Sequence, residues 1–291
     1  MFPAGWRVPL REWTNGFVDA LAVWAAPLFE GVSDAVLRAL FAIETALVWL
    51  PWWLLVVIVA VLMWHAAGRR VMPAVLSAAA LVLVGTFGLW EQAMTTLALM
   101  VVATVVAVVL GVPLGVAAAR APRLRAIVRP VLDVMQTMPS FVYLVPVVML
   151  FGLGNVSAVF ATVVYAIAPV VRLTDLGLRS VDVSLIEAAE SAGASELQTL
   201  WLVRFPLALP TVMAGVNQTI MLALSMVVLA SMIGARGLGQ EVLRGLQRGD
   251  VGVGLEAGLA IVVLAIIIDR MTALYAAREY SPGTDPSRRT R

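Results

Sequence analysis

Long uncharged stretches are the feature that most limits what this chain can fold into. Residues 134–171 run for 38 residues without an Asp, Glu or Arg, and four more such stretches occupy residues 46–68, 71–90, 94–119 and 205–235. A helix that crosses a bilayer needs about 20 mostly apolar residues. Over the whole chain 13% of the residues are charged, whereas a soluble domain is roughly 25% charged. The sequence therefore predicts an all-α polytopic membrane protein.

The uncharged stretches predict about seven transmembrane helices. The longest stretch exceeds one ordinary span and contains Gly-Leu-Gly-Asn at 152–155, residue types that favour a turn. We therefore divide it into spans near 135–151 and 157–172. A last span is expected near 254–272, with an acidic residue towards each end.

A Gly-x-x-x-Gly pair predicts one close helix contact. Gly111 and Gly115 lie on either side of Pro113 in the third span. Small residues at this spacing let two membrane helices approach each other closely. We therefore expect a neighbouring span to pack against this face.

The distribution of arginine predicts the orientation. Cytoplasmic loops hold an excess of Lys and Arg, and all 20 basic residues here are arginines. With the N-terminus outside, 14 of them fall in cytoplasmic segments and six outside. This favours a multi-pass membrane protein with its N-terminus outside and its C-terminus in the cytoplasm. The assignment depends on residues 134–171 forming two spans, because a single span would reverse the later loops.

The two ends of the chain are more polar than the rest. Residues 1–45 contain several acidic side chains and predict an amphipathic segment on the outer membrane surface. Contact with an outside partner is the alternative for this segment. Residues 276–291 predict a polar cytoplasmic tail.

Missing residue types exclude several functions. A P-loop requires a lysine that reaches the nucleotide phosphates, and this chain has no lysine. If ATP drives the protein, another subunit must hydrolyse it. The chain also has no cysteine and one histidine, His65, so we expect no catalytic residues, no metal site and no cofactor. The net charge of +2 is too small to indicate a nucleic-acid partner.

The loop between the fifth and sixth spans, residues 173–206, predicts a compact pair of short helices. Ser184 lies three residues before Glu187, which is the spacing of a capping box. The helix that it starts would run to about Ala192 and end at Gly193.

The second helix of this loop has signals of its own. Ser195 and Gln198 form another capping box, and the helix is expected to end before Pro206, because a residue that precedes proline avoids helical geometry. From the pattern alone, a docking surface and an ordinary amphipathic loop both remain open.

The stretch EAAESAGASELQTLWLVRFP resembles the EAA loop of bacterial binding-protein-dependent ABC importers. The family pattern is Glu-Ala-Ala, three residues, Gly, nine residues, Ile, one residue and Leu-Pro. The positions that correspond to it are Glu187, Ala188, Ala189, Gly193, Val203 in place of Ile, Phe205 in place of Leu, and Pro206. The resemblance implies that the loop is a coupling helix that docks into a separate cytoplasmic ATP-binding subunit.

Two further stretches resemble one branch of these permeases. DVMQTMPSFVYLVPVVMLFGLG, at 133–154, and LPTVMAGVNQTIMLALSMVVLASMIGARGLGQEVLRG, at 209–245, are similar to permeases for glycine betaine, proline betaine and choline. This implies a five-helix core at 93–275, with two additional transmembrane helices in 46–92. It also implies a location in the bacterial inner (plasma) membrane, a homodimer of permeases, a periplasmic or extracellular solute-binding protein, small-molecule cargo and alternating access.

Five residues are candidates for lining the pathway of such a permease. A quaternary ammonium is best met by aromatic faces or by oriented carbonyls and amides. Candidates of these kinds, and polar residues near them, are Asn217, Gln218, Ser225, Phe141 and Tyr143. The alternatives are interhelical hydrogen bonds for the polar residues and anchoring at the membrane interface for the aromatic ones.

Other transporters remain as alternatives. An ABC permease for another small solute, such as an amino acid or taurine, would share the EAA loop. An ion-coupled secondary transporter would often place carboxylates near the middle of its spans, and the long spans here have none there. A membrane enzyme would need a catalytic cluster that this composition does not provide.

Overall fold

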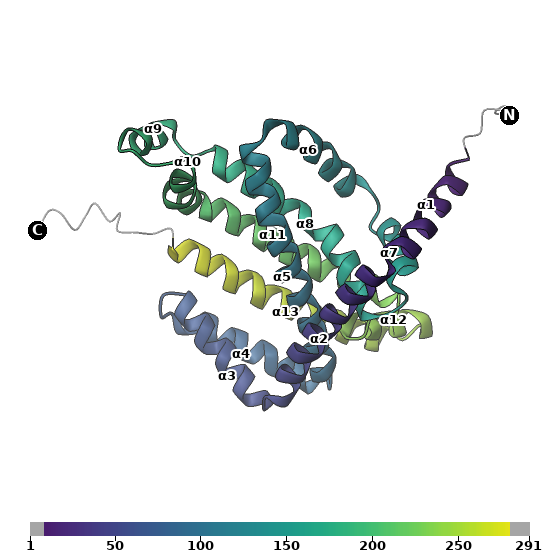
Figure 1. Ribbon diagram of the computed structural model, residues 1–291. Helices are drawn as coiled ribbons and strands as arrows, with labels where there is room; N and C mark the ends of the chain where they lie inside the picture. The colour runs from purple at the N-terminus through teal and green to yellow at the C-terminus, as the bar shows by residue number, and fades with distance from the viewer. Residues whose placement is uncertain (1–8, 280–291) are drawn as a thin grey trace, which may run out of the picture.

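The computed structural model describes residues 9–279, and all regular secondary structure within that range is helical. The all-α fold is therefore confirmed. Figure 1 shows the helices in chain order. Their bounds are α1 Leu10–Trp24, α2 Ala26–Trp49, α3 Trp52–Ala66, α4 Val71–Thr86, α5 Trp90–Arg120, α6 Pro122–Thr137, α7 Phe141–Phe151, α8 Asn155–Arg179, α9 Val183–Ser191, α10 Glu196–Gln198, α11 Phe205–Ser231, α12 Leu238–Arg248 and α13 Val251–Glu279. Of the tail predicted at 276–291, residues 276–279 belong to α13, which continues to Glu279. The rest of the predicted tail lies outside the described residues.

Four helices form the centre of the described structure. α5, α8, α13 and the continuous helix Glu196–Ser231, which contains α10 and α11, are long and apolar enough to cross a bilayer. α8 packs along both α5 and α11, and α11 also contacts α13. Counting each of two bent helix pairs as one span raises the number of possible spans from four to six.

The first two predicted spans are shorter than expected. α3 has 15 residues and α4 has 16, so at about 1.5 Å per residue they measure roughly 22 and 24 Å. The hydrocarbon core is about 30 Å thick. The span predicted at 46–68 begins late because Leu50, which precedes Pro51, is extended (φ −67°, ψ 130°) and separates α2 from α3.

The span predicted near 135–151 is not a single helix. The structure has two helices there, α6 and α7, with an angle of 104° between them. Met138 lies between the two helices and precedes Pro139, and its backbone is extended (φ −68°, ψ 136°). The proline therefore breaks the helix where the sequence reading continued it.

Hydrogen bonds and an ion pair define the two ends of the bundle. The amide of Gly154 donates to the carbonyl of Ile233 at 2.9 Å, and the amide of Arg236 donates to Asn155 Oδ1 at 3.0 Å. These bonds join the turn before α8 to the turn after α11. At the opposite end, Arg120 at the end of α5 lies 3.6 Å from Glu196 of α10. α6 and α7 together therefore carry the chain from one end of the bundle to the other (Figure 1).

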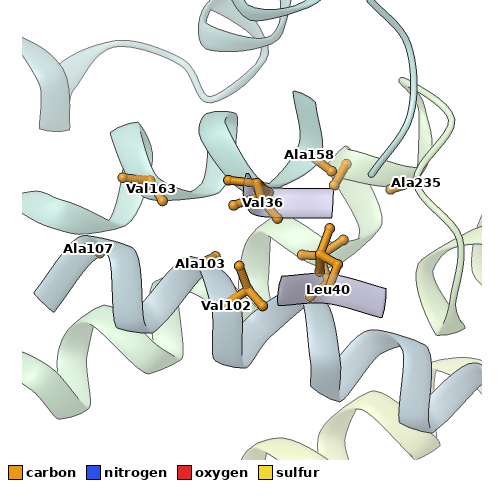
Figure 2. Packing of buried hydrophobic residues seen from close by; sticks show 11 residues of the cluster. Val36, Leu40, Val102, Ala103, Ala107, Ala158, Val163 and Ala235 are labelled. Atoms are coloured by element: carbon orange, nitrogen blue, oxygen red, sulfur yellow. The ribbon is translucent and has the colours of Figure 1, made fainter. Parts of the chain in front are cut away.

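The N-terminal helices are part of this bundle. α1 and α2 meet at an angle of 74°, and Val36 and Leu40 of α2 are buried against α5 and α8 (Figure 2). Thr95 Oγ1 also donates to Glu44 Oε1 at 2.7 Å. Residues 1–45 were predicted to lie on the membrane surface, and α2 differs from that prediction because it supplies side chains to the core.

The close contact predicted at the glycine pair is confirmed between α5 and α8. A Cβ added at Gly115 would lie 2.6 Å from Thr174 Cβ and 2.8 Å from the carbonyl oxygen of Val171. A Cβ at Gly111 would overlap Val170 of the same helix. The two helix backbones can approach this closely only because α5 has no side chains at these positions.

Candidate functional site

The loop after α8 folds into a small projection at one end of the bundle, which we call the knob (residues 182–198). Its first helix, α9, is capped by Asp182, whose side chain accepts a hydrogen bond from the amide of Ser184 at 2.9 Å. The predicted capping box of Ser184 and Glu187 is therefore wrong. An aspartate directly before the first helical residue is a favoured N-cap, and that signal was present in the sequence.

The pKa of the Asp182 carboxyl is lowered from its ordinary value. Hydrogen bonds from the backbone and the side chain of Ser184 are the cause, because they favour the ionised form that accepts them. The carboxylate that caps α9 is therefore stabilised as an anion.

Gly193 ends α9, as predicted. Its amide donates to the carbonyl of Glu190 at 2.9 Å, and the amide of Ala194 donates to that of Ala189 at 3.1 Å. This pair of bonds is a Schellman motif. The motif needs a left-handed residue, and Gly193 has φ +87°. A Cβ at this position would meet nothing within 4 Å, so the turn requires glycine for its backbone and not for lack of space.

The second helix of the knob begins as predicted and ends differently. Ser195 and Gln198 form the expected capping box, with bonds of 2.8 and 3.4 Å. The expected end before Pro206 is wrong, because the π-helical turn Thr199–Arg204 leads directly into α11. Proline cannot donate to the carbonyl four residues earlier, and its ring collides with it in a regular α-helix. We attribute the continuous helix to the wider π turn, in which the Phe205 amide bonds to the Leu200 carbonyl.

The knob exposes its small and apolar residues. Glu187, Ala188 and Gly193 are exposed, and Ala189 is half-buried. Large apolar side chains are exposed beside them, at Val183, Leu185, Leu197, Trp201 and Leu202. Of the three family positions that follow the knob, Val203 and Phe205 are half-buried and Pro206 is exposed.

A buried carboxylate fixes the helix that carries the knob. The side chain of Asp175, near the end of α8, is 7% exposed. Arg179 binds it at 2.8 and 3.1 Å, and two arginines of α6, Arg129 and Arg125, lie 3.4 and 4.0 Å from it. A carboxylate buried in this way requires partners, and these partners tie α6 to α8 just before the knob.

Sequence reasoning missed this cluster. Arg125 and Arg129 were among the 14 arginines used only to assign the orientation, and Asp175 fell within the loop predicted at 173–206. The spacing of Asp175 and Arg179, four residues apart on one helix, was the available signal. A second pair, Arg172 and Asp133, also joins α8 to α6.

The structure separates the five pathway candidates. Asn217 makes interhelical hydrogen bonds, because its Nδ2 donates to Asp269 at 3.0 Å and its Oδ1 accepts from Thr272 at 2.6 Å. Gln218 and Ser225 are exposed and lie seven residues, or about two turns, apart on one face of α11.

The two aromatic candidates also differ from each other. Phe141 is 51% exposed. Tyr143 is buried, and its hydroxyl donates to the carbonyl of Met135. Within residues 9–279 no group of three His, Cys, Asp or Glu side chains is placed to hold a metal ion.

Comparison with known proteins decides the family. Residues 111–279 match the family described as the inner membrane component of binding-protein-dependent transport systems. The chain belongs to this family. It is a membrane transport permease, and the family implies a separate ATP-binding subunit and a substrate-binding protein as its partners.

The permease is similar over most of its length to several curated proteins. It is 48% identical over 265 residues to the glycine betaine/proline betaine transport system permease protein ProW of Escherichia coli (strain K12), covering 91% of this chain and 74% of that one. It is 41% identical over 277 residues to the glycine betaine transport system permease protein OpuAB of Bacillus subtilis (strain 168), covering 95% and 98%. The resemblance to the betaine branch is therefore confirmed.

Solved structures show the same fold. The permease superposes on chains of the inward-facing MetNI methionine ABC transporter with TM-scores of 0.59 and 0.57, at 23% and 24% identity. The first superposition covers 66% of this chain and 96% of the other, and the second covers 64% and 93%. The fold is that of an ABC importer permease.

Proposed function

We propose that this permease forms the membrane pathway of an ATP-driven importer of quaternary-ammonium osmoprotectants, such as glycine betaine, proline betaine and choline. The observation that carries the proposal is identity of 41–48% over more than 90% of the chain to permeases named for glycine betaine. Two copies of the permease would enclose the pathway, and a solute-binding protein outside would deliver the cargo.

We further propose that the knob docks into the ATP-binding subunit. Its exposed apolar side chains favour a protein partner, because apolar surface is stabilised when it is removed from water. Ala188 and Ala189 would let the partner approach closely, Gly193 shapes the turn, and Glu187 lies at the exposed surface where it can contact the partner. Val203 lies in the π-helical turn that connects the knob to α11, and Pro206 is the second residue of α11.

The proposed orientation follows from the same docking. The end of the bundle that carries the knob would face the cytoplasm, with the N-terminus outside and the C-terminus inside. Arg120 and the arginines around Asp175 lie at that end, as expected for cytoplasmic ends of spans.

The exposed face of α11 is the proposed pathway surface. Ala214, Gln218, Met221 and Ser225 recur at helical spacing and are all exposed, so they are free to face a second permease or the cargo. Phe141 is exposed as well and remains a candidate for meeting a cationic cargo. Asn217 and Tyr143 would instead support packing.

Uptake by cells that lack their own betaine systems tests the cargo. The cells would express the permease with its ATP-binding subunit and solute-binding protein, and labelled glycine betaine would compete with unlabelled choline, proline betaine, taurine or an amino acid. The proposal expects competition by quaternary-ammonium solutes only. Inhibition by taurine or an amino acid alone would point to the alternative cargo class.

Cross-linking tests the docking surface. The chain has no cysteine, so Ala188→Cys introduces a unique thiol on the knob. Leu246→Cys, on α12 and 77% exposed, is the matched control at the other end of the bundle. A thiol-reactive photocross-linker should join Ala188→Cys, and not Leu246→Cys, to the ATP-binding subunit. Equal cross-linking from both positions would refute the docking assignment.

A further inference from the structure

A groove lies between α3, α4 and α13, and Figure 1 shows α3 and α4 on the side of the bundle away from α6. It has a volume of about 650 Å³ and is formed by α3, α4 and the second half of α13. Its wall is almost entirely apolar and includes Met63, Leu76, Ala80, Val263 and Ile266. Such a wall suits hydrocarbon chains better than a polar ligand.

Two arginines also line this groove. Arg70 lies in the link between α3 and α4, and Arg270 lies in α13. Among the residues whose side chains the structure describes, which do not include 276–279, neither guanidinium has a hydrogen-bond or ion-pair partner. Asp269, the carboxylate next to Arg270 in the sequence, accepts a hydrogen bond from Asn217 of α11 and not from Arg270. The groove therefore carries two positive charges that the described part of the protein does not neutralise.

Both arginines lie towards the end of the bundle that carries the knob. Figure 1 shows the α3–α4 link and the end of α13 on the same side as α9 and α10. There the hydroxyl of Tyr275 donates to the Leu62 carbonyl at 3.4 Å, and its ring stacks on His65 at a centroid distance of 6.2 Å. These contacts join α13 to α3 near the charged end of the groove.

The apolar part of the groove extends from this charged end towards the middle of the bundle. Val263 lies seven residues before Arg270 on α13, which corresponds to about 10 Å along the helix. Charge at one end and apolar wall along the rest match a molecule with an anionic head and a hydrocarbon tail. Basic pockets between membrane helices bind lipid head groups in this way.

We propose that this groove binds one anionic glycerophospholipid, with its phosphate between Arg70 and Arg270 and an acyl chain along Leu76, Ala80, Val263 and Ile266. Two guanidinium groups favour a head group with net negative charge, because arginine pairs strongly with phosphate oxygens. A zwitterionic lipid would bring an ammonium group close to the same two cations. The proposal does not depend on the cargo or on the docking of the knob.

Native mass spectrometry of the full-length permease, purified in a non-ionic detergent, tests the site. The probes are phosphatidylglycerol and phosphatidylcholine, each added alone. The wild type should retain one more phosphatidylglycerol than phosphatidylcholine per chain. Arg70→Gln and Arg270→Gln should each weaken that retention about tenfold, which corresponds to about 1.4 kcal/mol.

Two variants separate the site from general charge and from misfolding. Arg69→Gln removes the neighbouring arginine, which does not line the groove, and should retain phosphatidylglycerol as the wild type does. Ala80→Phe fills the apolar wall without changing any charge and should lose the lipid. A monodisperse elution profile verifies that each variant is folded.

Several results would overturn the proposal. One is equal retention of the two lipids by the wild type. Another is retention of phosphatidylglycerol that neither Arg70→Gln nor Arg270→Gln changes. A third is a loss in Arg69→Gln as large as the loss in those two variants. Displacement of the lipid by millimolar inorganic phosphate would also overturn it, because it would show an anion site that does not use the acyl chain.

Discussion

The turn at Gly193 gives the sharpest test of how the knob works. With φ +87°, a residue with a Cβ is strained there by roughly 1–2 kcal/mol, whereas asparagine adopts left-handed geometry more readily. Because a Cβ at this position would meet nothing within 4 Å, the first atom of a new side chain overlaps nothing inside the permease. Backbone strain therefore makes asparagine a milder substitution than alanine, whereas side-chain size makes alanine the milder one.

We expect uptake to follow strain. Gly193→Asn should retain most uptake. Uptake by Gly193→Ala should fall by up to about 5- to 30-fold, the factor that 1–2 kcal/mol represents. Uptake by Gly193→Val should fall further, because its branched Cβ is the least compatible with positive φ. The assay is labelled betaine uptake by the assembled transporter, with the amount of inserted permease measured in parallel. Hydrogen exchange of α9 should lose protection in the same order.

The opposite order would refute this reasoning. If Gly193→Ala transports better than Gly193→Asn, the glycine is needed for close approach of the ATP-binding subunit and not for the turn. Gly258→Ala, on α13 with nothing within 4 Å of the added Cβ, is the control for replacing a glycine without strain or overlap.

Three further predictions concern packing, charge and pH. Gly115→Ala should lower the thermal midpoint of the purified permease relative to Gly258→Ala, because an overlap of this kind costs about 1–3 kcal/mol while alanine adds back up to about 1 kcal/mol of helix propensity; equal midpoints would show that α8 can move away. Asp175→Asn should destabilise the permease by about 1–3 kcal/mol, less than a fully buried pair because its arginines are partly exposed, and an unchanged midpoint in thermal unfolding would contradict the role given to this carboxylate. Because the pKa of Asp182 is lowered, its carboxylate should cap α9 fully above the ordinary aspartate pKa of about 3.9. That contribution to stability should be lost only as the pH falls through the lowered pKa. Hydrogen-exchange protection factors of α9 should therefore be equal at pH 7 and pH 5, and lower in Asp182→Ala at both pH values. A fall in wild-type protection between these two pH values would contradict the lowered pKa.

The sequence predicted best where a local signal had one physical solution. Gly193 had to end α9, since a left-handed turn favours glycine, and the Gly-x-x-x-Gly pair had to meet a close neighbour. Prolines were harder to interpret. Pro51 and Pro139 break helices that the uncharged runs extended, whereas Pro206 follows a π turn and does not end its helix.

Long-range contacts could not be predicted from local pattern. The arginines around Asp175 come from α6 and α8, which only the packed fold brings together. Asn217 shows the same limit, because its spacing fits a pathway or a helix contact equally well, and only the position of Asp269 on α13 explains its hydrogen bonds. The core contribution of α2 was likewise hidden, because Val36 and Leu40 lie in a segment with many charged residues.

Transport into proteoliposomes tests the central claim most directly. The permease would be reconstituted with its ATP-binding subunit, with ATP inside the vesicles and the solute-binding protein and labelled glycine betaine on the other side. The account predicts accumulation that requires both the ATP and the ATP-binding subunit and that persists when ionophores remove proton and sodium gradients. Accumulation that needs an imposed ion gradient and continues without the ATP-binding subunit would contradict it.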